Sequence, residues 1–384
     1  MGKLFFHHVV AGKPDPIFAL LREFQEDARA QKIDLSAGIY RDEKLQPVLF
    51  RAVKEAEKLL PLVPKPYLPI EGDSRYLEKM GALVFGEFLW KAKGKTIFGA
   101  QAPGGTGALR VGGEFIKQEV GGRIAYSDPT WANHKQIFTR SGLEVESYPY
   151  GDFERCKKAL KGLAPGTAVL CQASCHNPTG IDFSMEEWKE ISQICKAGGL
   201  LPFFDLAYQG MGEGIEEDAA AIRLFIEEGH EMMVSCTQSK NFGIYNERTG
   251  AIFFVTESEG TAKKVGSKIK PIVRGLYSNP PAHGGKLVAM VLEKPELRKM
   301  WEEELSEMRK RLQKVRKKLA EKLSLKSIAQ GRGMFGMLPI TQEQALQLKK
   351  EFGIYLTLDG RINLAGLHDD GVDYLVRAYE KIVV

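Results

Sequence analysis

Several features are scarce in this 384-residue sequence, and their absence narrows the roles that the protein can have. No apolar run reaches the roughly 18 residues of a membrane-spanning helix, and the N-terminus lacks the apolar core and cleavage site of a signal peptide. The five cysteines are few and odd in number, so we expect free thiols and a cytoplasmic location rather than a disulfide framework. The net charge of +5 is too small to indicate binding to nucleic acid or to a membrane surface.

The central part of the chain alternates short apolar runs with amphipathic stretches. The apolar runs are continuous, as in strands that are buried on both faces of a sheet. The amphipathic stretches carry apolar residues at helical spacing. This alternation predicts an α/β fold in which helices cover a mainly parallel sheet. The expected strands are 167–173, 200–206, 232–236 and 250–255, and the expected helices are 185–197 and 218–228.

The pattern changes near residue 295. A long helix is predicted over 295–323, because apolar residues recur there at spacings of three and four and the only proline stands at its start. The remainder has the pattern of a smaller α+β unit with two helices, and we expect the segment before residue 47 to pack with it. Its short strands are expected at 336–340, 354–357 and 361–363.

These patterns predict three divisions of the chain. Residues 1–46 form an N-terminal arm and part of the small domain, and residues 47–300 form the large domain. Residues 301–384 form the small C-terminal domain together with the long connecting helix. The small domain is therefore expected to be built from both ends of the chain.

Three local patterns have a functional interpretation that we reject. The basic run 309–318 in the long helix has no interleaved aromatic residues, which a platform for single-stranded nucleic acid requires, so we interpret it as a solvated face. Cys171, Cys175 and His176 are only three candidate zinc ligands without a second C-x-x-C pair, and no metal site is predicted. The string 94–96 (GKT) is similar to the end of a P-loop but lacks the upstream glycine.

Two other segments are candidates for binding an anion. The glycine-rich string 103–110 follows a predicted strand and opens a helical stretch, so its backbone N–H groups and the hydroxyl of Thr106 can face a phosphate. The string 237–240 (TQSK) leaves another strand, with Arg248 eight residues after Lys240, and it combines hydroxyls, cations and an amine nucleophile. Each segment alone is equally well explained as a tight turn or a surface loop.

Polar residues also stand at or near the ends of three predicted strands. These residues are Asn177, Asp205 and Lys240. In open parallel sheets, ligands bind beyond the carboxyl ends of the strands. A single aspartate at such a position usually caps a helix or makes a turn. Three strand ends that converge with a glycine-rich loop instead predict a ligand site.

Six strings, in their order and spacing, resemble the class I pyridoxal-phosphate aminotransferases, and within them the aspartate/aromatic aminotransferase subfamily. The similarity extends from about Asp15 to the C-terminus. The strings are 101–110 (QAPGGTGALR), 176–180 (HNPTG), 204–210 (FDLAYQG), 239–248 (SKNFGIYNER), 277–281 (YSNPP) and 360–363 (GRIN).

The resemblance implies an enzyme that moves the amino group of aspartate or glutamate to a 2-oxo acid such as 2-oxoglutarate, by a ping-pong mechanism with pyridoxal 5'-phosphate. Lys240 is implied to bond covalently to the cofactor and then to transfer protons, since an amine can do both. Asp205 is implied to keep the pyridine nitrogen protonated, with His134 hydrogen-bonded behind it. The remaining contacts implied for the ring and its phenolic oxygen come from Trp131, Asn177 and Tyr208.

The resemblance also implies a phosphate site and a homodimer with shared active sites. Tyr67 is implied to reach the phosphate that is bound by the other subunit. The partners are therefore small amino acids, 2-oxo acids and a second copy of the chain. The residues implied to bind the phosphate within one subunit are Gly105, Thr106, Thr237, Ser239 and Arg248.

Two arginines are implied to bind the substrate. Arg361 pairs with the α-carboxylate, and Arg274 of the partner subunit pairs with a side-chain carboxylate, because a planar guanidinium matches carboxylate geometry. Gly38, in the string AGIY, borders the same pocket through its backbone. Trp131 and Asn177 are implied to contact the substrate as well.

The resemblance leaves three interpretations open and includes some departures. Thr106 and Asn279 favour the aspartate type, because aromatic-preferring relatives tend to have serine there. An aromatic (tyrosine/phenylalanine) aminotransferase that shares 2-oxoglutarate is the alternative, and a non-catalytic binding protein on the same fold is the third interpretation. The departures are Gln238 where many relatives have tyrosine, the proline-rich segment 64–69 around Tyr67, and a lip loop, 42–47, that is shorter than usual.

Overall fold

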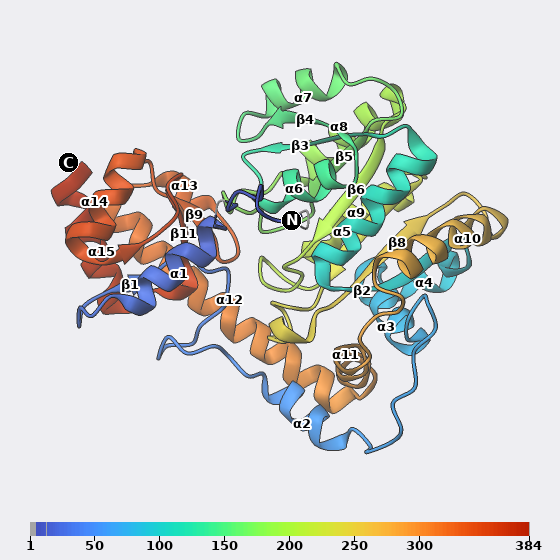
Figure 1. The fold of residues 1–384 in the computed structure, drawn as a ribbon, viewed down its shortest axis with the longest axis horizontal. Coiled ribbons are helices and arrows are strands. Elements are labelled where there is room, and N and C mark those ends of the chain that lie inside the picture. The colour runs from blue at the N-terminus through green and yellow to red at the C-terminus, as the bar shows by residue number, and fades with distance from the viewer. Residues whose placement is uncertain (1–4, 13, 384) are drawn as a thin grey trace, which may run out of the picture.

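The computed structural model describes residues 5–12 and 14–383, and its centre is one seven-stranded sheet (Figure 1). The strand order is β2-β8-β7-β6-β5-β3-β4. Neighbouring strands are parallel except at β8, which is antiparallel to both β2 and β7. The expected strands are present with small shifts at their ends. Two further strands, β3 and β4, were not predicted. The bounds of the seven strands are β2 Ile97–Pro103, β3 Arg123–Asp128, β4 Glu144–Pro149, β5 Ala168–Gln172, β6 Leu201–Leu206, β7 Met232–Thr237 and β8 Thr249–Val255.

Helices cover both faces of this sheet, which confirms the predicted α/β fold (Figure 1). Phe203 packs in the apolar cluster on one face and Phe204 in the cluster on the other, since successive side chains of a strand point in opposite directions. This double burial explains the continuous apolar runs. The first face is covered by α5 (Gly104–Phe115), α6 (Asn133–Arg140) and α10 (Glu259–Leu276), and the second by α8 (Met185–Gly198) and α9 (Ala220–Glu227).

A smaller α+β unit is built from both ends of the chain, as predicted. Strand β1 (Ile33–Asp34) pairs in parallel with β10 (Ile354–Tyr355), and β9 (Phe335–Met337) pairs antiparallel with β11 (Arg361–Asn363). The unit has one short helix more than the two expected after residue 323. Its helices are α1 (Pro16–Glu26), α13 (Lys326–Gln330), α14 (Gln342–Phe352) and α15 (Asp369–Val383).

The long helix α12 (Pro295–Leu323) joins the two units and has the bounds expected from the sequence. It packs against α2 (Arg51–Leu59) and α11 (His283–Glu293), and its later turns contact α15. The helix runs without a break across residue 300, where we placed a boundary, so the division at this point stays a prediction. Two residues of the basic run 309–318, and Lys322 after it, contact acidic side chains of α15. Arg316 of the same run is buried, so our interpretation of the run as a solvated face is wrong at this residue. The ion pairs join Lys314 to Asp369, Lys318 to Asp369 and Asp373, and Lys322 to Asp373.

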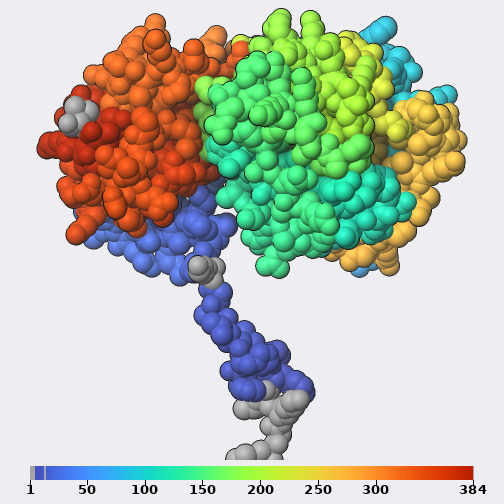
Figure 2. Space-filling view, turned by 90° about the horizontal axis from the view of Figure 1, so that it is seen from above, coloured from blue at the N-terminus to red at the C-terminus, as the bar shows by residue number. Residues whose placement is uncertain are grey.

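The N-terminal segment 5–12 extends away from the rest of the molecule (Figure 2). Its apolar side chains are exposed, including Phe6 at 84% and Val10 at 87%. Helix α1, which follows, buries none of its residues. In the ranges 5–12 and 14–383, no helix is both long and apolar enough to cross a membrane.

Candidate active site

The carboxyl ends of β5, β6 and β7, the first turn of α5 and strand β11 surround one cavity of about 280 Å³. It lies where the two structural units meet. Every candidate that we expected to act within one subunit lines it, except His134. The lining candidates are Gly38, Gly105, Thr106, Trp131, Asn177, Asp205, Tyr208, Thr237, Ser239, Lys240, Arg248 and Arg361.

Asp205 lies at the end of β6 and has a fixed orientation. Its Oδ2 is 3.1 Å from Nε2 of His134, and Nδ1 of the same ring is 2.8 Å from Oγ1 of Thr130. His134 is fully buried and therefore lies behind the cavity wall, as the resemblance implied. Within the described chain, Oδ1 of Asp205 accepts no hydrogen bond, so this oxygen is available to a cationic N–H group in the cavity.

Lys240 follows the last strand residue of β7 by three positions and is half-buried. Burial lowers the pKa of its amine from 10.5 to about 8, Asp205 opposes this shift, and Arg248 adds to it. Its Nζ lies 5.1 Å from the ring centroid of Tyr208 and forms no ion pair with any residue that the structure describes. A lysine with this pKa is partly neutral near physiological pH, as a nucleophile or a general base must be.

A polar cradle lies on the α5 side of the cavity. Oγ1 of Thr237 is 3.0 Å from Oγ of Ser239, and Nη1 of Arg248 donates to the same Ser239 oxygen at 3.5 Å. Gly104 opens α5 with a φ of +72°, and a Cβ there would lie 2.5 Å from Nη2 of Arg248. Because Gly104 and Gly105 leave the backbone N–H groups at the helix start uncovered, the cradle fits a phosphate.

Arg361 reaches the cavity from β11 and is only 8% exposed. Its Nη2 donates to the carbonyl of Ser36 at 2.6 Å, and its Nη1 donates to Oδ1 of Asn177 at 3.3 Å. The ring of Phe335 lies against the guanidinium, 4.8 Å from the centroid to Cζ. Among the residues that the structure describes, none accepts a hydrogen bond from the buried Nε, so a carboxylate ligand can supply the missing acceptor.

The turn that carries Asn177 is held by a residue that the sequence analysis missed. Gln172, at the end of β5, accepts from the backbone N–H of Asn177 and donates to its carbonyl, both at 2.9 Å. A glutamine that ends a buried strand was the available signal, but we read it as part of an apolar run. The other cavity residues that we did not predict are Ile17, Leu109, Ala207, Tyr245 and Phe335.

Two predicted residues lie outside this cavity. The side chain of Tyr67 is 90% exposed. Arg274 lies near the end of α10, where it donates a hydrogen bond to Ser278. A single chain therefore does not bring either residue to the site that we assigned it.

The sequence departures lie apart from the cavity as well. Gln238 is buried and accepts a hydrogen bond from the fully buried Tyr76, so its side chain does not line the cavity. The lip loop closes on itself through a bridge between Arg41 and Pro47 and a hydrogen bond from Leu45 N to the carbonyl of Asp42.

His176, next to Asn177, helps to hold the turn that carries Asn177. Its Nε2 is 2.9 Å from Oγ of Ser127, its Nδ1 is 2.9 Å from Oγ1 of Thr179, and its ring stacks on Tyr150. Burial lowers the pKa of His176 to about 3, so it is neutral. Both ring nitrogens are thus occupied by hydroxyl groups of the protein.

Comparisons with known proteins agree with this geometry. The family model described as aminotransferase class I and II matches residues 30–378. An aspartate aminotransferase of Pseudomonas aeruginosa is 40% identical, with 98% of this chain and 99% of the relative covered. A tyrosine aminotransferase of Rhizobium meliloti is 42% identical, with 92% and 94% covered.

The structural comparison gives the same family. A solved aromatic-amino-acid aminotransferase of Burkholderia pseudomallei, covalently bound to pyridoxal phosphate, has a TM-score of 0.95 at 40% identity, with 100% of both chains covered. Family model, relatives and solved structure all extend over almost the whole chain. The protein therefore belongs to the class I and II aminotransferases and is a pyridoxal-phosphate-dependent transaminase.

Proposed function

We propose that the protein transfers the amino group of aspartate or glutamate to a 2-oxo acid such as 2-oxoglutarate by a ping-pong mechanism. The observation that carries the proposal is the convergence of Lys240, Asp205 and Arg361 on one cavity. One group is a partly neutral amine, the second an unpaired carboxylate oxygen, and the third a buried guanidinium. Together they can transfer a proton, hold a cationic ring nitrogen and bind a carboxylate.

The residues of the cavity fit pyridoxal 5'-phosphate. The hydroxyls of Thr237 and Ser239, with Arg248 and the uncovered helix start at Gly105, would hold the phosphate. The free Oδ1 of Asp205 would accept the N–H of the pyridine ring. When bound, this cofactor supplies an aldehyde for the amino group and a ring that withdraws electrons. Trp131 would stack on the ring, while Asn177 and Tyr208 would face its phenolic oxygen.

The chain's own residues then have separable tasks. Lys240 holds or releases the proton that moves at the α-carbon, since its pKa of about 8 suits both directions near neutral pH. Tyr208 keeps its phenolic proton, because burial raises its pKa, and it acts as a hydrogen-bond donor. Arg361 binds the α-carboxylate and thereby orients the substrate over the site.

Borohydride reduction of the holoenzyme followed by peptide mapping tests the site. We expect the pyridoxyl group on Lys240, and we expect Lys240→Ala to lose nearly all turnover. Lys263, an exposed lysine of α10, is a matched control, and its alanine variant should retain full activity. A label on any lysine other than Lys240 contradicts the assignment.

The preference for aspartate rests on Thr106 and Asn279. Thr106 lines the cavity, whereas Asn279 donates to the carbonyl of Leu68 at 3.3 Å and so supports the segment that carries Tyr67. The apolar cavity residues Ile17 and Leu109 favour the alternative, an aromatic aminotransferase. Initial rates with aspartate, tyrosine and phenylalanine, each with 2-oxoglutarate, distinguish the two. A higher kcat/KM for tyrosine than for aspartate contradicts the aspartate assignment.

We also propose a homodimer with shared sites. Tyr67 and Arg274 lie outside the cavity of their own chain, and apolar side chains around Tyr67 are exposed, with Leu62 at 98% and Val63 at 46%. Mixing inactive Lys240→Ala with inactive Arg274→Asp subunits tests the sharing. Hybrid dimers contain one pocket with both native residues and should regain part of the activity. If subunits exchange and no activity returns, the sites are not shared.

A cytoplasmic location completes the proposal. All five cysteines are buried free thiols, which suits a reducing compartment. Fractionation of the producing cells, with the activity measured in each fraction, tests this. Recovery of the activity outside the cytoplasmic fraction contradicts it.

A further inference from the structure

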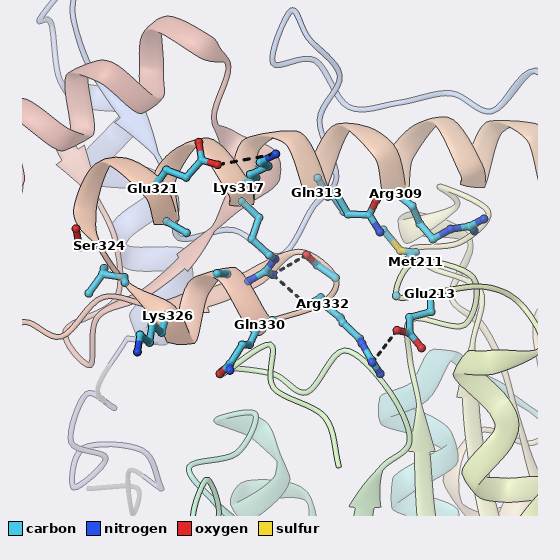
Figure 3. A pocket seen from close by; sticks show the side chains of 18 residues that line it. Met211, Glu213, Arg309, Gln313, Lys317, Glu321, Ser324, Lys326, Gln330 and Arg332 are labelled. Atoms are coloured by element: carbon cyan, nitrogen blue, oxygen red, sulfur yellow. Dashed lines mark hydrogen bonds and ion pairs between the residues drawn. The ribbon is translucent and has the colours of Figure 1, made fainter. Parts of the chain in front are cut away.

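A groove of about 730 Å³ lies between the end of α12, helix α13 and the loop 211–213, away from the catalytic cavity (Figure 3). Arg332 and Glu213 form an ion pair at 2.7 Å beside it. Arg316 contributes to its wall although it is only 3% exposed. Burial lowers the pKa of Arg316 from 12.5 to about 10, so the guanidinium is charged at neutral pH.

Arg316 has carbonyl partners and, within the described ranges, no carboxylate partner. Its Nη1 donates to the carbonyl of Ile328 at 3.0 Å. Its Nη2 donates to the carbonyls of Arg332 at 3.1 Å, Gly333 at 3.0 Å and Phe335 at 2.7 Å. Removing a cation from water costs free energy unless partners such as these carbonyls take the place of the lost water molecules. The buried guanidinium therefore ties the segment 328–335 to α12.

This segment leads directly to the catalytic cavity. The ring of Phe335 lies against the guanidinium of Arg361, at 4.8 Å, and meets Tyr208 edge-on, with the ring centroids 6.0 Å apart. The backbone N–H of Arg332 donates to the carbonyl of Gly180 at 2.6 Å. Gly180 ends the turn that carries Asn177, and Asn177 in turn accepts from Arg361.

Two glycines show how closely this arrangement is packed. A Cβ at Gly331 would lie 2.3 Å from Nη1 of Arg316. Gly180 has a φ of +71°, and a Cβ there would lie 2.3 Å from the carbonyl oxygen of Phe335. Neither position accepts a side chain unless the segment or the guanidinium moves.

We propose that Arg316 is a positioning residue for substrate binding: it holds Phe335 and the Asn177 turn so that Arg361 is aimed at the α-carboxylate. The inference rests on the proposed role of Arg361. Because every amino acid has this carboxylate, losing Arg316 should weaken the binding of all substrates alike. The cofactor contacts from Asp205 and Lys240 come from other strands and should persist.

Steady-state kinetics of the holoenzyme with Arg316→Met test the proposal. We expect KM for aspartate and for phenylalanine to rise by at least about tenfold, by similar factors, because a charge-assisted contact is misplaced. We expect kcat to fall less than KM rises, and the cofactor to stay bound, because the phosphate cradle, Asp205 and Lys240 do not depend on the segment 328–335. Arg316→Lys should restore part of the affinity. Lys317→Met is the matched control, since its side chain is 79% exposed, and its kinetics should equal those of the wild type.

Several outcomes would overturn the proposal. These are an unchanged KM in folded Arg316→Met, a rise for only one of the two substrates, or a fall confined to kcat. If Arg316→Met does not fold, the Gly331→Ala variant tests the proposal instead, because its new Cβ displaces the Arg316 guanidinium and leaves the charge in the protein. It should raise both KM values together, and unchanged values would refute the role.

An Arg361→Leu arm separates this inference from the proposed function. Wild-type protein without transamination refutes the function itself. Normal substrate affinity in Arg361→Leu refutes the role of Arg361. Impaired Arg361→Leu together with normal Arg316→Met refutes only the positioning role of Arg316.

Discussion

The imidazole of His134 is held between Oδ2 of Asp205, at 3.1 Å, and Oγ1 of Thr130, at 2.8 Å. Both ring nitrogens are therefore occupied, and the ring has one orientation. The carboxylate in front of it is fixed in turn, with its second oxygen directed to the cavity. A fixed charge of this kind needs no reorganisation when the reaction begins.

We expect the Asp205→Ala variant to bind the cofactor but to have a kcat at least about 100-fold lower. This is the usual effect on rate of removing one strong electrostatic group from a dry active site. His134→Ala leaves the carboxylate in place and only frees its orientation, so kcat should fall by about tenfold. Stopped-flow measurement of each half-reaction checks both values. A larger loss in His134→Ala than in Asp205→Ala would reverse the assigned roles.

The pKa of Lys240 predicts how the cofactor-free protein takes up pyridoxal phosphate. Only the neutral amine attacks an aldehyde, so the rate of incorporation should rise with pH and level off above a midpoint of about 8. In Asp205→Asn the midpoint should move lower, because the carboxylate raises the pKa of Lys240. Absorbance changes after mixing, followed from neutral to alkaline pH, give both midpoints. A midpoint near 10.5 would mean that burial does not act on this amine.

The two arginines should differ in substrate dependence. A charge-assisted pair contributes roughly 1.5–3 kcal/mol, so Arg274→Leu should lower kcat/KM for aspartate by about tenfold to a hundredfold. Phenylalanine lacks a side-chain carboxylate and should be little affected. Arg361→Leu should impair both substrates.

The ratio of kcat/KM for aspartate to that for phenylalanine measures this difference. It should collapse in Arg274→Leu and stay nearly constant in Arg361→Leu. The opposite pattern would exchange the two roles. An equal fall in kcat/KM for both substrates in Arg274→Leu would mean that Arg274 stabilises the fold or the dimer and does not bind the substrate.

Gly104→Ala should weaken cofactor binding. The φ of +72° is unfavourable for alanine, and the new Cβ would lie 2.5 Å from Arg248 Nη2. We expect a loss of about 1–3 kcal/mol in the free energy of unfolding and a clearly higher Kd for pyridoxal phosphate. Gly260→Ala is the control, since a Cβ at this exposed helix position would lie no closer than 3.7 Å to the Ser258 hydroxyl. Equal stability of the two variants would show that the loop around Gly104 adapts.

Much of the fold could be predicted because burial leaves a pattern in the sequence. Residues 201–206 and 232–237 appear as strands since both faces are covered, and Asp205 and Lys240 were expected near one edge from that alone. The direction of β8 could not be predicted, because a continuous apolar run reports burial and not orientation.

The contacts of Arg361 could not be predicted from the residues near it in the sequence. Its acceptor Ser36 is 325 positions away, and Phe335 belongs to the paired strand β9. No spacing of residues near Arg361 indicates either neighbour. The resemblance identified the arginine, whereas its support depends on how the two ends of the chain fold together.

The position of β8 determines when this protein can fold as it leaves the ribosome. Strand β2, which leads into the glycine loop, lies at the edge of the sheet, and β8 is its only neighbour among residues 5–12 and 14–383. Residues 249–255 are synthesised roughly 150 residues after β2, which is about 8–30 s at ordinary rates of translation. During that time the future phosphate cradle has no strand beside it. A nascent chain arrested before Thr249 therefore presents β2 as an unpaired edge, and such edges invite aggregation and chaperone binding.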